Sequence, residues 1–173
     1  MPVTLRDALT LAKKLKECAP KAFVAPSEGL RAANEFVISQ AMVHDTRGYI
    51  EKVANQINGS YEKGWYDGCA VMMRRLVETL IIECFECHNI THKIQNPANG
   101  EYLYLSDLID ATLNESTAWV LGRNAKKGLP KLKGIGDRSA HSRRFNAFRE
   151  DIDKCSDDFR VVCQELLYIA KLK

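Results

Sequence analysis

One histidine, His141, lies within the most basic segment of the chain, shortly after a Gly-Ile-Gly string at 134–136 that predicts a turn. Between Val120 and Arg149 there are nine lysines and arginines and a single acid, Asp137, whereas the whole chain has a net charge of only +3. A concentrated positive field attracts polyanions, and a histidine side chain within it can transfer protons. The segment therefore predicts phosphate-backbone binding or chemistry. The alternative is a solvated loop whose lysines only keep the protein soluble.

The cations of this segment are the expected contacts to a nucleic acid. Lysine and arginine contacts to phosphate supply position and affinity without reading the base sequence. The residues expected to bind, with Arg138 beside them, are Lys126, Lys127, Lys131, Lys133, Arg143 and Arg144.

Length and composition are those of an ordinary globular protein. A chain of 173 residues can bury a proper core as one compact domain, and 46% hydrophobic and 27% charged residues are typical values. No apolar run is long enough to span a bilayer, and the charged N-terminal segment does not resemble a signal peptide. We therefore expect a cytoplasmic protein without membrane association, whose six cysteines are reduced thiols.

Apolar residues recur at three- and four-residue steps along most of the chain, which predicts an all-α antiparallel bundle. The two principal helices are expected over 61–87 and 148–169, because each has a continuous apolar stripe. Other helices are expected over 4–18, 27–57, 105–113 and 116–127. Gly128 and Pro130 are expected to end the helix over 116–127.

The N-terminal helices of residues 1–60 are expected to pack on a core domain of residues 61–173, the whole forming one compact domain. The two principal helices should share one hydrophobic core, because the spacing of their apolar residues places those residues on single faces. The expected members of that core are Trp65, Met72, Leu76, Leu80, Phe159, Val162 and Leu166.

The string Cys84-Phe85-Glu86-Cys87-His88 spells the pattern of covalent haem attachment. That chemistry requires export, and Cys84 already belongs to an apolar helix stripe. With His92 one turn further along, zinc binding is a second interpretation, but a tetrahedral site normally draws on two segments. We therefore predict buried thiols, with no bound metal and no cofactor.

Two charged residues, Arg74 and Glu78, interrupt the apolar sequence of the helix over 61–87. One interpretation is an exposed ion pair between residues four apart, worth a few tenths of a kcal/mol. The other is that one of the two faces the basic segment and orients His141. Because Arg75 is adjacent to Arg74, at least one of these arginines points away from any shared site.

These residues also carry a resemblance to a known superfamily. The run YEKGWYDGCAVMMRRLVE over 61–78 resembles the first core helix of a HEPN-type helical domain, and the string GDRSAH over 136–141, followed by a long helix, resembles its second half. The similarity covers about 61–169. Within the superfamily the chain is most similar to an uncharacterised branch that is often attached to restriction and other prokaryotic defence proteins. That branch typically has an Arg-Arg-x-Leu-Glu-like string, here 74–78, and a Gly-Asn-x-x-x-His-like string, here 136–141.

The resemblance implies an antiparallel helical bundle, a homodimer and, in active members, metal-independent RNA cleavage at the dimer cleft. Cleavage asks for a general base on the ribose 2′-hydroxyl and a guanidinium that holds the phosphate. Active members place an arginine four to six residues before the histidine, followed by a polar residue. Here Asp137 matches the polar position, but the residue before it is Gly136. The residues that the resemblance and the charge pattern implicate in catalysis are His141, Arg138, Asp137, Arg74 and Glu78.

Two functions therefore stand at this point. The first is an RNA-directed, HEPN-like protein of prokaryotic defence or stress response, either an endoribonuclease or its degenerate RNA-binding relative. The second is a non-catalytic helical module that docks on a restriction or effector partner. Phosphate binding falls steeply with salt concentration, whereas docking driven by apolar burial is far less sensitive, so a salt series separates the two.

Overall fold

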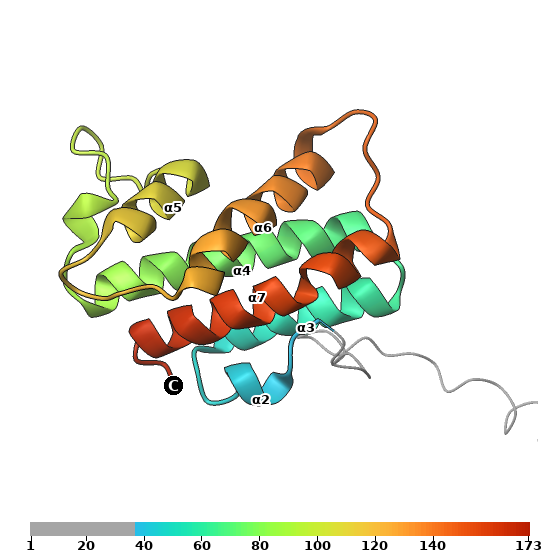
Figure 1. Cartoon of the computed structure of the whole chain (residues 1–173), viewed down its shortest axis with the longest axis horizontal. Helices are drawn as coiled ribbons and strands as arrows, with labels where there is room; N and C mark the ends of the chain where they lie inside the picture. The colour runs from blue at the N-terminus through green and yellow to red at the C-terminus, as the bar shows by residue number, and fades with distance from the viewer. Residues whose placement is uncertain (1–36) are drawn as a thin grey trace, which may run out of the picture. The chain divides into compact units, whose positions relative to one another are not determined.

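Four long helices lie alongside one another in the computed structural model, which describes residues 37–173 (Figure 1). They are α3 (Gly48–Glu62), α4 (Tyr66–Cys87), α6 (Arg123–His141) and α7 (Arg149–Ile169). Two shorter α-helices and a single 3-10 turn complete the described part, namely α2 (Gln40–Val43), α5 (Leu105–Asn114) and η1 (Thr91–Lys93). No β-strand occurs among these residues, so the prediction of an all-α protein is confirmed.

Helices α4 and α7 run in one direction, and α3 and α6 run in the other (Figure 1). Within residues 37–173, no helix is long and apolar enough to cross a membrane. All described residues belong to one compact unit that spans Arg31–Lys173. The helix predicted over 4–18 lies outside the described residues.

The predicted helices over 61–87, 105–113 and 148–169 correspond to α4, α5 and α7. Of the expected core residues, five are fully buried, namely Leu76, Leu80, Phe159, Val162 and Leu166. Met72 is half-buried against them. The prediction that Trp65 joins the core is wrong, because this side chain is 68% exposed. The chain leaves α3 through Gly64 at φ +75° and begins α4 only at Tyr66, so Trp65 precedes the helix whose periodicity predicted its burial.

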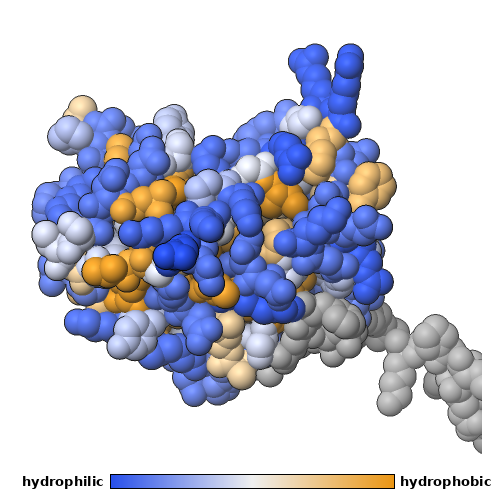
Figure 2. Space-filling model, viewed as in Figure 1, coloured by the Kyte–Doolittle hydropathy of each residue, from blue (hydrophilic) through white to orange (hydrophobic). Residues whose placement is uncertain are grey.

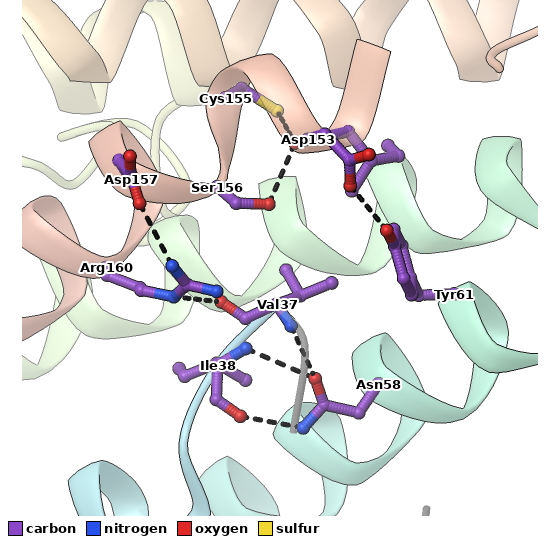
Figure 3. A network of polar contacts seen from close by, with 10 residues as sticks. Val37, Ile38, Asn58, Tyr61, Asp153, Cys155, Ser156, Asp157 and Arg160 are labelled. Carbon is purple, nitrogen blue, oxygen red and sulfur yellow. Dashed lines mark hydrogen bonds and ion pairs between the residues drawn. The ribbon is translucent and has the colours of Figure 1, made fainter. Parts of the chain in front are cut away.

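The long helix predicted from Ser27 to Ile57 is not formed over its described part. Asp45 adopts a left-handed conformation at φ 60° between α2 and α3, and α3 then continues past Asn58 and Gly59 to Glu62. The sequence Asn58-Gly59 is expected to end the helix after Ile57, but the buried side chain of Asn58 instead binds the backbone of an earlier segment. Its Oδ1 accepts hydrogen bonds from the backbone of Val37 at 3.1 Å and Ile38 at 3.2 Å, and its Nδ2 donates to the Ile38 carbonyl at 2.7 Å (Figure 3).

Helix α6 differs most from the prediction. The helix expected over 116–127 does not form before Arg123, because side chains bind the backbone N–H groups of the preceding, non-helical segment. Glu115 Oε1 accepts the backbone N–H of Thr117 at 2.8 Å, and the backbone N–H of Gly122 donates to Glu165 at 2.8 Å. The helix then continues through Gly128 and Pro130 to His141. Consequently the predicted turn at 134–136 is also wrong, since these residues are helical.

Packing explains why α6 tolerates the residues that were expected to end it. Pro130 is exposed and removes one helical hydrogen bond, whereas the buried apolar stripe holds the helix on α4 and α7. That stripe is Ala125, Leu129, Leu132 and Ile135. Glycine permits close approach: a Cβ at Gly128 would lie 2.9 Å from Val162 Cγ2, and one at Gly136 would lie 2.5 Å from Arg74 Cβ. Both glycines therefore serve helix packing.

The five described cysteines are free thiols, and four of them are buried. Burial raises the pKa of Cys69 to about 12 and that of Cys155 to about 11. The Cys84 thiol donates to the Leu166 carbonyl at 3.3 Å, and His88 Nε2 lies 3.1 Å from the Ile169 carbonyl. The string at 84–88 thus forms part of the contact between α4 and α7.

These positions predict a sharp ranking of thiol reactivity. In the native protein at neutral pH, Cys87 is expected to react first among the described cysteines, because it is the one that is partly exposed. The buried thiols should react only on unfolding, since the reactive thiolate is disfavoured by burial. Mass spectrometry after brief alkylation measures this ranking, and Cys87→Ser is the control. Rapid native labelling of Cys84 or Cys163 would contradict the packing of α4 against α7.

Candidate nucleic-acid interface

The exposed side of α6 is basic along its whole length. The helical spacing that buries its apolar stripe turns its cations outward, and α6 is about 27 Å long at 1.5 Å per residue. The loop 142–148 adds two exposed arginines to the end of this surface. We call this surface the basic face, and its residues are Arg123, Lys126, Lys127, Lys131, Arg138, His141, Arg143 and Arg144.

The cations of the segment differ in how they are engaged. Lys131 donates to Asp158 on α7 at 2.8 Å but keeps a largely exposed side chain. Lys133 is half-buried and donates to Asp137 at 2.5 Å, so it belongs less to the surface than predicted. The remaining predicted contacts have no side-chain partner among residues 37–173, namely Lys126, Lys127, Arg143 and Arg144. These four cations are available to phosphates.

A charged cluster joins α4 to α6 beside the basic face. Arg74 Nε donates to Asp137 Oδ1 at 2.8 Å, and Arg74 Nη1 lies 3.5 Å from Glu78 Oε2. Partial burial raises the pKa of Asp137, but hydrogen bonds and charges from Lys133 and Arg74 outweigh it, so the net shift is downward. Asp137 is therefore a carboxylate with both oxygens engaged, and the single acid of the basic segment contributes little repulsion to an approaching anion.

His141 is the last residue of α6 and is exposed. It lies one turn beyond Asp137, but within the described part of the chain no hydrogen bond joins the two residues. Arg138, one turn before the end of α6, places its guanidinium 4.7 Å from the centre of the Phe145 ring. The five residues implicated in catalysis thus form two groups: Arg74, Glu78 and Asp137 in the charged cluster, and Arg138 and His141 at the helix end.

Arg74 faces α6, as one of the two interpretations required, while Arg75 is exposed and points away. Arg74 contacts Asp137 and Glu78, and no contact with His141 is found among the described residues. The position of Arg138 in the last turn of α6 has an electrostatic advantage of its own, because the carbonyl end of a helix favours cations.

Sequence reasoning placed Trp65 and Phe148 in the apolar stripes of the two principal helices, but both side chains are exposed. Each immediately precedes the first residue of its helix, so the helical periodicity that predicted its burial does not extend to it. Sequence reasoning also missed a pocket of about 870 Å³. The pocket lies toward the C-terminal ends of α4 and α7 and contains none of the predicted site residues; its wall includes His88, Trp119, Val120 and Tyr168.

Comparisons of the chain with protein families, with curated proteins and with solved structures found no match.

Proposed function

We propose that this protein binds RNA through the basic face, as a HEPN-like protein of prokaryotic defence or stress response. The observation that carries the proposal is the concentration of exposed cations on one side of α6 and the following loop. Acids that would repel a phosphate are engaged there, since Asp137 binds Arg74 and Lys133 and Asp158 binds Lys131. The HEPN-type resemblance of 61–169 agrees with this assignment and adds the expectation of a homodimer.

If the bound RNA is cleaved, His141 is the general base. The imidazole takes the proton of a ribose 2′-hydroxyl, the 2′-oxygen attacks the adjacent phosphorus, and the bond to the 5′-oxygen breaks. That oxygen takes a proton from the imidazolium or water, which leaves a cyclic phosphate and a 5′-hydroxyl. The guanidinium that stabilises the phosphate comes from Arg138, Arg143 or Arg144, because Arg74 is held by Asp137 and Glu78.

The test is a binding and cleavage assay with labelled single-stranded RNA over a series of salt concentrations. The logarithm of affinity is expected to fall linearly with the logarithm of salt concentration, because cations release counterions from phosphates. His141→Ala is expected to abolish any cleavage while leaving affinity nearly unchanged, since one imidazole adds little charge. His92→Ala, at an exposed histidine outside the basic face, is the control.

Absence of nucleic-acid affinity even at low salt would contradict the proposal. That result would favour the second function, a helical module that docks on an acidic surface of a restriction or effector partner. Binding without cleavage would instead identify the degenerate RNA-binding relative of the superfamily's nucleases.

A further inference from the structure

Two large aromatic side chains project into solvent where α4 and α7 begin. Trp65 is 68% exposed and Phe148 is 69% exposed, and each immediately precedes the first residue of its helix. The Asp67 side chain accepts a hydrogen bond from the backbone N–H of Ala147 at 2.9 Å, which ties the start of α4 to the residue before Phe148. The two aromatic residues therefore lie at the same end of the bundle.

The backbone that carries both side chains is held in place. The Trp65 N–H donates to the Ser60 carbonyl at 2.8 Å, and the Trp65 carbonyl accepts from Cys69 at 2.9 Å. The Phe148 N–H donates to Asp151 at 2.9 Å. Two exposed rings on an ordered backbone gain little stability from burial, and large apolar groups exposed at the same end of a protein can serve as a binding surface.

Two arginines at this end of the bundle lie against other aromatic rings. Arg138 stacks on Phe145 at 4.7 Å, and the Arg149 guanidinium lies 5.6 Å from the Tyr61 ring, to whose hydroxyl it also donates at 3.0 Å. Figure 2 shows hydrophobic and hydrophilic side chains together at the end of the bundle where α6 passes into α7. Arg143 and Arg144 lie in that connecting loop.

The acids of this end are mostly engaged by neighbouring groups. Asp67 and Asp151 accept backbone N–H groups, and Asp153 accepts the Tyr61 hydroxyl (Figure 3). Glu150 lies 3.9 Å from Lys154 and remains exposed. Because most of these acids are engaged, the exposed Arg143 and Arg144 are the groups that an anion with flat apolar surfaces would meet at this end.

We propose that Trp65 and Phe148 form a stacking platform for unpaired bases, which makes single-stranded RNA the ligand class of the basic face. This inference rests on the proposed function. Aromatic rings bind bases of any sequence through their π-faces while neighbouring cations track the phosphates. A duplex hides its base faces in the helical stack, so it can use only the cations. A second copy of this chain is a poorer occupant, since it would bring the same cations face to face.

The experiment compares a 20-nucleotide single-stranded RNA with a duplex of the same length, using Trp65→Ala, Phe148→Ala and the double variant. Each single substitution is expected to weaken single-strand binding about tenfold, as loss of one stacked base does. Duplex affinity should not change, because every cation that binds phosphate is retained. The matched control is Tyr104→Ala combined with Tyr168→Ala, two rings that are 84% and 76% exposed elsewhere on the surface.

Tryptophan fluorescence gives a second readout. The chain has two tryptophans, and Trp119 is buried, so the emission of exposed Trp65 should be quenched by single-stranded RNA and not by duplex. Trp65→Phe should lose this signal yet keep most of the affinity, because the ring face is retained. Equal loss of single-strand and duplex affinity, or no loss in the double variant, would overturn the platform while leaving RNA binding intact. A wild-type protein without affinity for either RNA would overturn both proposals.

Discussion

Gly136→Ala is expected to destabilise the protein by about 1–3 kcal/mol, the usual cost of forcing one extra carbon into a packed contact. The added Cβ would lie 2.5 Å from Arg74 Cβ and 2.8 Å from Arg74 Cδ. Arg74 Cβ is fixed to the backbone of α4, so it cannot rotate away as the end of a flexible side chain can. Relief therefore requires α6 to move from α4, which strains the contact between Arg74 and Asp137.

Gly134→Ala is the matched control, because it makes the same chemical change two residues earlier in the same helix. No atom lies within 4 Å of a Cβ added at Gly134. Alanine there should stabilise the protein by about 0.5–1 kcal/mol, since glycine is the poorer helix former. Urea denaturation of the two variants measures the difference. If both substitutions stabilise, α4 and α6 do not approach as closely as the structure requires.

The same contact bears on position 136, where the resemblance to HEPN-type domains would imply an arginine. An arginine side chain could not be accommodated there, because the aliphatic part of Arg74 already occupies the adjacent space. The guanidinium that binds Asp137 comes from α4, through the 2.8 Å hydrogen bond of Arg74. Glycine at 136 is thus a packing requirement of this chain.

Helices α4 and α7 could be predicted because each has an uninterrupted apolar stripe across five or more turns. Helix α6 could not, because glycine and proline disfavour helix in an isolated chain, and the benefit of glycine appears only when a neighbouring helix is in place. Gly128 against Val162 and Gly136 against Arg74 are such cases. The rule that predicts a helix end from these residues concerns local propensity, and here tertiary packing outweighs it.

The candidate site was predictable in its charge and unpredictable in its pairings. The excess of cations between Val120 and Arg149 is visible in the sequence, and it does lie largely on one exposed surface. The bond between Arg74 and Asp137 joins residues 63 positions apart, so it depends on the register of α4 against α6. Sequence spacing alone predicted only the pair of Arg74 with Glu78, whose atoms lie further apart than those of Arg74 and Asp137.

The double variant Arg143→Glu with Arg144→Glu is expected to lower RNA affinity by about tenfold for each site, since hydrogen bonds to charged groups contribute roughly 1.5–3 kcal/mol. Both arginines are exposed and have no side-chain partner among residues 37–173, so their reversal should leave stability unchanged. The loss should be the same for every RNA sequence, because binding to phosphate carries no sequence information. The slope of log affinity against log salt should become shallower by roughly 0.7 for each phosphate of a single strand that the variant no longer neutralises.

The matched control is Lys171→Glu with Lys173→Glu, which changes the net charge by the same amount at two exposed positions. Both lysines lie beyond the C-terminal end of α7, whereas the loop 142–148 precedes its N-terminal end. If affinity depends on the basic face, the control loses little. If both variants lose affinity equally, RNA responds only to the net charge of the protein, and the basic face has no special role. If binding weakens while the salt slope stays unchanged, the two arginines do not bind phosphate. That result would favour the docking function.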